Sequence, residues 1–577
     1  MTTPSGTAAH VLVQQLETYG VEYVFGTCGH TNIALLDALA NSSIEFVIAR
    51  HEQSAAHAAD GYARASGKTG VVLMHVGPGL MNGVTGVATA AFDSVPLVGI
   101  SGDVPSYYAG RHPHQEVNLH ADADQTAIYR SFVKRAWTVH RVEDLTRHTE
   151  RAFWTATSGR PGAVLLNVPM DVFSRPLSSV RIPALPGNTD LPHPTRHQID
   201  RIADLLTRAA RPLIYVGGGL RDHTEDLLAL AEHLDIPVAH SLMAKGTVPD
   251  RHPLLMGMTG FWGLELTNEY TRTADVVLAL GTRFAETDSS SWDPAYTWGF
   301  PPGRLIQVDL DPAEIGRNYP VEIGVVADAG ETVAAVRRAV SATAPDGVHR
   351  EGLRERITAV RTELFESSRE RGTSDAFPLR PERILRDLRD VLPDDAILVT
   401  DVGWNKNGVA QCYELPEGGR FITPGGLSTM GFGPAAAVGV QTAQPARTVV
   451  ALIGDGGMSA QLPALPMAVE QGLPVVFVVM NNRAHGTIAD LQAANFGASY
   501  GCEFRDRDGN AYSPDFAALG RACGADGYRP TSADEFRKHL QEAVANRRTA
   551  VVDVAMVNEP VPTPGHWNIK DIYQGRF

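Results

Sequence analysis

The sequence predicts an α/β protein built from three doubly wound parallel-sheet domains. Short continuous apolar runs of strand length, such as residues 448–453 and 473–480, suit strands that are buried on both faces. These runs alternate with stretches of helical spacing, such as residues 52–67. Repeated alternation of this kind is typical of a parallel sheet covered by helices on both faces.

Two stretches of different composition divide the chain. Residues 174–196 are rich in Pro, Ser and Gly, and residues 349–384 are highly charged, which indicates a solvated helix followed by a second linker. We therefore predict an N-terminal domain over residues 1–180, a central domain over 195–345 and a C-terminal domain over 375–577.

The expected elements follow the same alternation within each segment. The N-terminal segment opens with an amphipathic helix that Gly20 closes, and the helix predicted over 459–472 in the C-terminal segment ends at Gly472. The strands expected in the first segment lie at 21–26, 69–76 and 163–173. The C-terminal segment has its buried strands at 396–403, 448–453 and 473–480.

Composition excludes several function classes. The 577 residues include 50 Lys and Arg against 65 Asp and Glu, a net charge of −15 that disfavours nucleic acid or an anionic membrane as a partner. The four cysteines are scattered without a CxxC pair, which fits a reducing cytosol. The first 20 residues lack the features of a secretory signal, and no uncharged run approaches the ~18 residues of a membrane span. We expect a cytoplasmic protein.

Polar residues follow two of the apolar runs. Gly454-Asp455-Gly456 ends one expected strand, and Asn481-Asn482 ends the next. Because the carboxyl ends of parallel strands meet at one edge of a sheet, Asp455 and Asn482 can converge on one point. Carboxylate, amide and backbone carbonyl oxygens suit Mg²⁺ or Ca²⁺, and Mg²⁺ commonly completes its shell with phosphates. A lone Gly-Asp-Gly would more simply be a turn, but the combined pattern predicts a diphosphate held through a divalent metal.

The pattern resembles the metal and diphosphate motif of thiamine-diphosphate (ThDP) enzymes of the acetolactate synthase-like group. Residues 50–72 are similar to the glutamate-bearing helix of that family, and residues 77–105 and 425–439 resemble two further blocks, in the expected order. The resemblance implies an N-terminal domain that binds the aminopyrimidine and a C-terminal domain that binds the diphosphate. It also implies a homodimer or homotetramer with active sites between chains.

The resemblance implies a role for each matched residue. Glu52 would hydrogen-bond N1′ of the aminopyrimidine and promote deprotonation of the thiazolium C2, while the protein positions and tunes the cofactor. Met430 would support the bent shape of ThDP. The implied metal ligands are Asp455, Asn482 and the carbonyl of Ala484. Further cofactor contacts are expected at Gly456, Gly457 and Gly486.

The reaction is less sharply defined by the sequence. Acetolactate synthases usually carry Pro-Gly-Gly after the first strand, where this chain has Gly29-His30. After the Asn pair they show a Glu-Glu-Gln-Gly run and an acceptor-selecting tryptophan, where this chain has Arg483-Ala484-His485-Gly486 and Leu491. These departures count against a biosynthetic acetolactate synthase.

Histidines stand at the expected edges of the site. His30, His75 and His485 follow expected strands or the metal motif, and Gln115 matches a substrate-side glutamine of relatives. Neutral imidazoles could move protons to a carbonyl or alkoxide oxygen near neutral pH. His112 and His114 are weaker candidates, and Cys28 is expected to be a small packing residue.

Several reactions remain open. The leading interpretation is decarboxylation of a 2-oxo acid with carboligation. The alternatives are a lyase or hydrolase that cleaves an acyloin or 1,2-diketone without decarboxylation, and a 2-hydroxyacyl-CoA lyase. Two hypotheses from other functional classes are a non-catalytic scaffold protein and a nicotinamide-dependent oxidoreductase. Residues 305–320 and 281–292 resemble stretches that meet FAD or ADP in some relatives, whereas other relatives bind nothing there.

Overall fold

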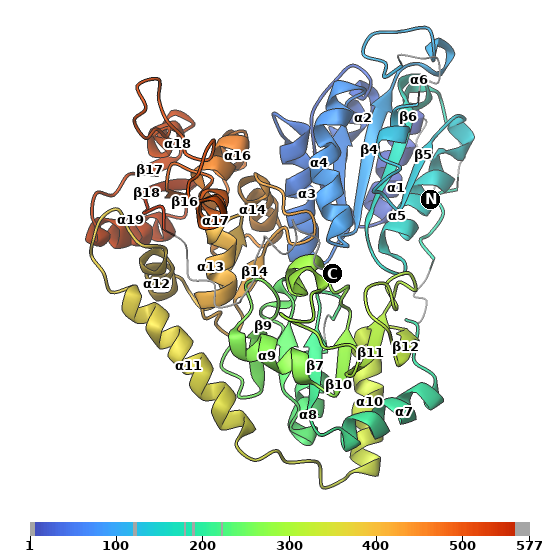
Figure 1. Ribbon diagram of the computed structural model, residues 1–577. Coiled ribbons are helices and arrows are strands. Elements are labelled where there is room, and N and C mark those ends of the chain that lie inside the picture. The colour runs from blue at the N-terminus through green and yellow to red at the C-terminus, as the bar shows by residue number, and fades with distance from the viewer. Residues whose placement is uncertain (1–5, 119–123, 178–180, 187–190, 221–222, 560–577) are drawn as a thin grey trace.

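A computed structural model describes residues 6–118, 124–177, 181–186, 191–220 and 223–559 of the chain. The structure contains three α/β domains (Figure 1). In this view the N-terminal domain lies at the upper right, the central domain below and the C-terminal domain at the left. Each domain contains a six-stranded sheet whose pairings are all parallel. The predicted fold class is confirmed.

The first and third sheets share one strand order. It is β2-β1-β3-β4-β6-β5 in the first and β14-β13-β15-β16-β18-β17 in the third. The first consists of β1 (Tyr23–Gly26), β2 (Glu45–Ile48), β3 (Gly70–Met74), β4 (Leu97–Asp103), β5 (Arg135–Thr138) and β6 (Ala163–Pro169). The third consists of β13 (Ile397–Thr400), β14 (Arg420–Ile422), β15 (Val449–Gly454), β16 (Val476–Asn481), β17 (Asp526–Tyr528) and β18 (Ala550–Ala555). In both, the order reverses beside the first strand, so a ligand crevice is expected beyond β1/β3 and β13/β15.

The central sheet has a different order, β12-β11-β10-β7-β8-β9. Its strands are β7 (Pro212–Val216), β8 (Val238–His240), β9 (Leu255–Met258), β10 (Val276–Leu280), β11 (Arg304–Asp309) and β12 (Ile323–Val326). This order, with the first strand central and the chain winding outward in both directions, is that of dinucleotide-binding folds.

Helices cover both faces of each sheet (Figure 1). The N-terminal domain has α1 (Ala8–Thr18), α2 (Ile33–Leu39), α3 (Glu52–Ser66), α4 (Pro78–Phe92), α5 (Leu145–Thr157) and α6 (Met170–Ser174). The central domain has α7 (Arg196–Arg208), α8 (Thr224–Leu234), α9 (Glu265–Thr273) and α10 (Ala329–Thr343), and α11 (Leu353–Arg371) leads out of it. The C-terminal domain has α12 (Pro381–Val391), α13 (Trp404–Cys412), α14 (Phe432–Ala443), α15 (Asp455–Ala460), α16 (Ala464–Glu470), α17 (Gly486–Phe496), α18 (Phe516–Ala522) and α19 (Ala533–Ala545).

Two element predictions were wrong in their boundaries. The helix expected over 459–472 is two helices, because α15 starts at Asp455 and ends before Pro463, whose ring cannot continue a helix from the preceding turn. The strand expected over 163–173 ends at Pro169, and the chain turns there into α6. The solvated helix predicted after the central domain is confirmed as α11, of whose 19 residues only Ile357, Arg361 and Ser368 are buried.

Helices α3 and α14 pack the first and third domains together within one chain. Alanines of α3 and α14 share one apolar core with Phe432. A Cβ atom at Gly439 would lie 2.6 Å from the carbonyl carbon of Ala58 and 2.8 Å from the backbone nitrogen of Tyr62. Because those neighbours are backbone atoms, the two helices can approach this closely only where side chains are very small. Around this contact, Arg50 pairs with Glu470 and Ser54 hydrogen-bonds Gln461.

No helix in the described parts of the chain is both long and apolar enough to cross a membrane.

The close contact of α3 and α14 makes a prediction about stability. Gly439→Ala forces the two helices apart and should lower the free energy of unfolding by about 1–3 kcal/mol, the usual cost of overpacking. Gly472→Ala is the matched control, because nothing lies within 4 Å of its Cβ position and only its φ of +61° is unfavourable for alanine. Gly472→Ala should lower the free energy of unfolding by about 1 kcal/mol. Urea unfolding followed by circular dichroism compares the two, and a larger loss in Gly472→Ala would contradict the packing argument.

Candidate active site

A buried carboxylate stands at the switch point of the first sheet. Glu52 begins α3, directly after β2, and is 8% exposed. Its Oε1 accepts a hydrogen bond from Thr27 Oγ1 at 2.7 Å, and its Oε2 accepts one from Asn82 Nδ2 at 3.1 Å. A Cβ atom at Gly79 would lie 2.7 Å from Oε1, so glycine there lets the N-terminus of α4 close over the carboxylate. Glu52 is thus fixed in place by residues that sequence reasoning did not single out.

His75 follows β3 beside this carboxylate and is held at both ring nitrogens. Its Nε2 lies 2.9 Å from Oε1 of Gln115, and its Nδ1 lies 2.8 Å from Oγ1 of Thr31. The backbone N–H of Val76 donates to the same Thr31 oxygen at 3.4 Å. Because the Gln115 oxygen can only accept, His75 carries its proton on Nε2, and Thr31 donates to Nδ1. The structure therefore favours one neutral tautomer of His75.

Two further histidines extend the group. The ring of His30 packs edge-on against His75, with centroids 4.8 Å apart, and lies 5.8 Å from the ring of His114. Burial, together with the neighbouring His75 and His114, lowers the pKa of His30, which favours the neutral imidazole. The weaker candidate His114 therefore lies in the group. Among the described residues, the exposed His112 makes no ring contact with this group, and the expectation that Cys28 is a packing residue was wrong, because Cys28 is exposed.

Three oxygens meet at the switch point of the third sheet. Asp455 follows β15 and Asn482 follows β16, as the sequence predicts for strands that pair in parallel. The carboxamide oxygen of Asn482 lies 3.1 Å from Oδ1 of Asp455 and 3.0 Å from the carbonyl oxygen of Ala484, while its nitrogen donates to Oδ1 of Asn558 at 2.8 Å. If the oxygen and nitrogen of the Asn482 carboxamide exchanged places, the contacts with Asp455 and Ala484 would become hydrogen bonds. The Asn482 oxygen would then face the Oδ1 oxygen of Asn558.

The charge on Asp455 has no counter-charge among the described residues. The side chain is 1% exposed, and its Oδ2 has no hydrogen-bond partner. Burial raises the pKa of Asp455 to about 7 although nearby backbone amides act in the opposite direction. A buried carboxylate facing an amide oxygen and a carbonyl is the donor set of a hard divalent cation. No group of three or more His, Cys, Asp or Glu side chains in the described chain could hold a metal, so this mixed set is the candidate.

Small residues open the space beside the three oxygens. At Gly456, a Cβ atom would lie 3.0 Å from the ring of His485 and 3.1 Å from Cε of Met430, so these two side chains meet over the turn. At Gly457 it would lie 2.8 Å from the carboxylate of Asp401. His485 is further held by Phe504, whose ring centroid lies 4.8 Å away. The structure therefore brings the predicted Met430, His485 and glycines together.

Sequence reasoning missed a third loop of this site. Trp404 and Asn405 begin α13, just after β13, the strand next to β15. A Cβ atom at Gly486 would lie 2.8 Å from both the Trp404 ring and Oδ1 of Asn558, which shows how tightly the loops converge. The Oδ1 atom of Asn405 is buried without a hydrogen-bond partner. The signal was available, because residues 396–403 were predicted to be a strand of the same sheet.

The acidic stretch of the central domain is already engaged by an arginine. Arg160 of the N-terminal domain lies 2.7 Å from Glu314 and 3.4 Å from Asp311. Burial raises the pKa of the nearby Asp309 to about 6. Any nucleotide in this region would therefore have to approach carboxylates that already have a guanidinium partner.

Comparison with known proteins assigns the chain to a family. Three family models match it: the thiamine pyrophosphate enzyme N-terminal TPP binding domain over residues 6–128, the central domain over 199–336 and the C-terminal TPP binding domain over 401–554. The chain belongs to the thiamine pyrophosphate enzyme family. The Glu52 group (Glu52 with Thr27, His75 and Asn82) lies inside the N-terminal model. The Asp455 group (Asp455, Asn482 and Ala484) lies inside the C-terminal model.

Similar proteins cover almost the whole chain. A probable acetolactate synthase large subunit of Methanocaldococcus jannaschii is 34% identical, over 95% of this chain and 91% of its own length. An acetolactate synthase isozyme 3 large subunit of Escherichia coli is 33% identical, over 95% and 94%. The acetolactate synthase large subunit of Corynebacterium glutamicum is 33% identical, over 95% and 86%. The family resemblance drawn from the motifs is confirmed, and the chain is a thiamine pyrophosphate-dependent enzyme.

The oxygen cluster predicts a strict requirement for a divalent cation. Removing Asp455 leaves only neutral oxygens, so Asp455→Ala should weaken Mg²⁺-dependent binding of ThDP by at least about 100-fold, beyond what loss of an outer-shell partner costs. Isothermal titration with ThDP at fixed Mg²⁺ measures this, and Asp508→Ala, which removes an exposed carboxylate elsewhere, is the control. Equal ThDP affinity in both variants would exclude Asp455 as a metal ligand.

Proposed function

We propose that this enzyme uses ThDP and Mg²⁺ to decarboxylate a 2-oxo acid and to join the remaining fragment to a second carbonyl compound. The observation that carries the proposal is the pairing of a buried Glu52 carboxylate in one TPP binding domain with an Asp455–Asn482–Ala484 oxygen set in the other. Relatives that match nearly the full chain are named acetolactate synthase large subunits, which supports carboligation.

Each group has a separate task in this proposal. Asp455, Asn482 and the carbonyl of Ala484 would hold Mg²⁺, whose remaining positions suit phosphate oxygens. Glu52 would bind the aminopyrimidine, and Met430, which meets His485 over Gly456, would support the ring system. When bound, ThDP supplies the carbon nucleophile that attacks the substrate carbonyl. Everything else, including proton delivery and substrate orientation, is left to side chains of this protein.

His75 is the best placed proton donor. Its Nε2 proton points to Gln115, and a substrate oxygen that replaces this partner would find the proton already oriented. His30 packs edge-on against His75, and its lowered pKa favours the neutral imidazole. Gln115, next to this proton, is placed to hydrogen-bond the substrate.

A second reaction is favoured by one observation. The group of His75, His30, His114 and Gln115 gathers proton donors and acceptors around Glu52. Such a group suits cleavage of an acyloin or a 1,2-diketone without release of CO₂, because the leaving carbonyl or an attacking water needs proton transfer. This lyase or hydrolase reaction is therefore the alternative to decarboxylating carboligation.

We also propose that a second copy of the chain completes the active site. Thr89 of α4 lies 3.2 Å from Thr429, next to Met430, whereas Gly79 of the same helix packs on Glu52. Ten residues of helix separate them, which is about 15 Å. Among the described residues, no hydrogen bond joins the Glu52 group to the Asp455 group. In a homodimer or homotetramer, the Asp455 group of one chain would complete the site around the Glu52 group of another chain.

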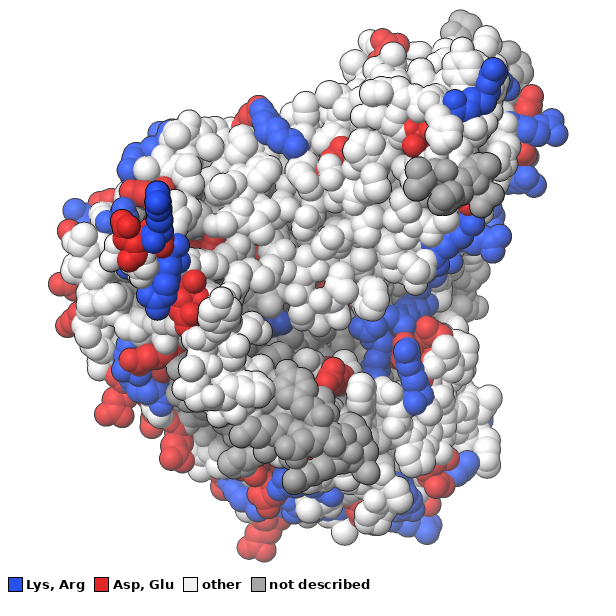
Figure 2. Space-filling view, turned by 45° about the horizontal axis from the view of Figure 1, so that its top comes forward, with Lys and Arg blue, Asp and Glu red and all other residues white. Residues whose placement is uncertain are grey.

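The surface of the two domains suits such an assembly. Large apolar side chains are exposed beside both groups, among them Ile33, Met81, Met430 and Ile488. Figure 2 shows a broad face over the upper part of the molecule with few charged residues, while Lys, Arg, Asp and Glu gather toward its edges. Exposed large apolar side chains, together with a face that carries few charges, suit a protein–protein contact.

An adenine nucleotide in the central domain is a subsidiary proposal. Its sheet order suits FAD or ADP, and Asp309 and Asp311 stand at the end of β11. Arg160 competes for Asp311 and Glu314, so a bound nucleotide should displace or share this guanidinium. The visible absorbance of the purified protein tests for a flavin directly.

A turnover experiment tests the proposed function. The protein with ThDP and Mg²⁺ is offered pyruvate, longer 2-oxo acids and 1,2-diketones, and CO₂ and products are measured by mass spectrometry. We expect CO₂ and a 2-hydroxy ketone product, and Glu52→Gln should turn over about 10²–10⁴-fold more slowly, the usual range for lost acid–base catalysis. Diketone cleavage without CO₂ would support the alternative, and undiminished turnover by Glu52→Gln would overturn the mechanism.

The hydroxyl of Thr31 should set the protonation of His75. Thr31→Val keeps the shape but removes the donor to Nδ1, which frees the ring to take the other tautomer. We expect kcat/KM to fall about tenfold, the value of one buried hydrogen bond. Thr31→Ser, which keeps the hydroxyl, should resemble the wild type. If both variants lose activity equally, the threonine acts through packing alone.

A further inference from the structure

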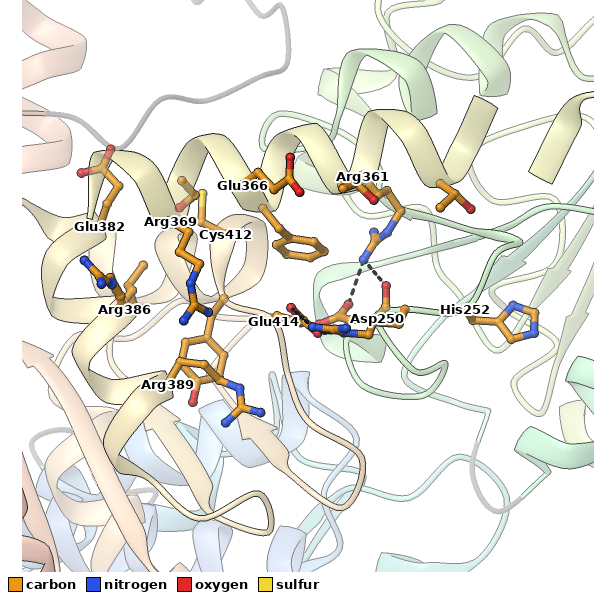
Figure 3. A pocket seen from close by; sticks show the side chains of 17 residues that line it. Asp250, His252, Arg361, Glu366, Arg369, Glu382, Arg386, Arg389, Cys412 and Glu414 are labelled. Atoms are coloured by element: carbon orange, nitrogen blue, oxygen red, sulfur yellow. Dashed lines mark hydrogen bonds and ion pairs between the residues drawn. The ribbon is translucent and has the colours of Figure 1, made fainter. Parts of the chain in front are cut away.

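A cavity lies away from both groups of the active site. It has a volume of about 430 Å³, within the range of small-molecule sites, and forms where the central and C-terminal domains meet. Its walls come from α11, from α12, from the end of α13 and from the loop at residues 250–252 (Figure 3). Neither Glu52 nor Asp455 lines it.

One end of the cavity is lined by three arginines and by one carboxylate, Glu382, which already lies 3.0 Å from Arg371. Figure 3 shows Arg369, Arg386 and Arg389 at that end. Asp390 serves three guanidinium groups at once: it lies 3.3 Å from Arg369, 3.9 Å from Arg386 and 3.1 Å from Arg537. The partner of Arg389 is Asp394, whose side chain is 72% exposed and screened by solvent. These guanidinium groups therefore keep capacity for a further anion.

The carboxylates at the other end are already neutralised. Asp250 is buried and lies 2.9 Å from Lys245 and 3.2 Å from Arg361. Glu414 pairs with Arg251. These acids consequently do not cancel the positive charge at the end formed by α11 and α12.

Between the two ends the wall is apolar. Phe365 lies on α11 with Arg361 against its ring, 5.1 Å from the centroid, and Leu385 and Tyr413 are buried beside it. Burial raises the pKa of the Cys412 thiol, which therefore packs as a neutral group. A ligand for this cavity would combine a negatively charged head with a flat apolar body.

We propose that this cavity binds a small aromatic oxyanion, with its phosphate or carboxylate on Arg369 and Arg389 and its ring beside Phe365. Arg369 and Phe365 belong to α11, the helix that leads out of the central domain, while Arg389 belongs to α12 of the C-terminal domain. A ligand bound in this cavity would contact both of these elements, away from Glu52 and Asp455. The cavity is therefore suited to an effector rather than to the substrate.

Direct binding to the full-length enzyme saturated with ThDP and Mg²⁺ tests the proposal. The probes are phenyl phosphate and benzoate, with inorganic phosphate lacking the ring and benzyl alcohol lacking the charge. Isothermal titration should show saturable binding, one molecule per chain, for at least one of the two complete probes. That probe should bind at least tenfold more tightly than inorganic phosphate or benzyl alcohol. Tighter binding of phenyl phosphate would indicate recognition of a phosphate, and tighter binding of benzoate would indicate recognition of a carboxylate.

Variants locate the bound probe. Arg369→Ala combined with Arg389→Ala should weaken binding at least tenfold, whereas Arg196→Ala, an exposed arginine on α7 paired with Asp200, should leave it unchanged. Each altered pair has one largely exposed member, Arg369 in one and Asp394 in the other, so the fold should persist. Asp455→Ala should also bind the probe as the wild type does. No saturable binding, equal binding by the double variant, or loss of binding in Asp455→Ala would each overturn the proposal.

Discussion

The contact of α3 with α14 is the constraint on which the arrangement of this molecule depends. Backbone meets backbone at Gly61 and Gly439, so the distance between the first and third domains is fixed by main-chain atoms. Interlocked side chains could adjust by changing rotamers, but two backbones in contact cannot. Glu52 begins α3, and Met430 stands just before α14. The same pair of helices therefore joins two domains and positions one residue from each half of the site.

The repeated sheet order explains why both halves of the site have the same architecture. In the first domain the chain leaves β1 and β3 at Thr27 and His75, and in the third it leaves β13 and β15 at Asp401 and Asp455. Adjacent strands whose helices lie on opposite faces leave a crevice at this point, and loop residues can fill it without disturbing the sheet. One architecture thus supports two different groups, a hydrogen-bonded carboxylate in one domain and the Asp455–Asn482–Ala484 oxygen set in the other.

Much of this could be predicted from the sequence, for identifiable reasons. Asp455 and Asn482 were paired correctly because buried parallel strands are continuous apolar runs, and their ends must meet at one edge. Thr27, Thr31 and Asn82 were missed because single polar residues in loops have no spacing that distinguishes a hydrogen-bond partner from a solvated side chain. The break at Pro463 was missed because the apolar period continues across it, and exposed Cys28 shows that residue type alone does not decide burial in a loop.

The two halves of the site differ in how they manage charge. Asp455 is buried, and burial raises its pKa to about 7. Glu52, in contrast, has both oxygens occupied by neutral donors, and in the neighbouring histidine group the pKa of His30 is lowered, which favours its neutral form. Under the proposed function, this division would place the Asp455 carboxylate where the diphosphate is held and the neutral donors where a carbonyl is polarised. The hydrogen bond between Thr31 and His75 therefore lies in a different domain from the Asp455–Asn482–Ala484 oxygen set.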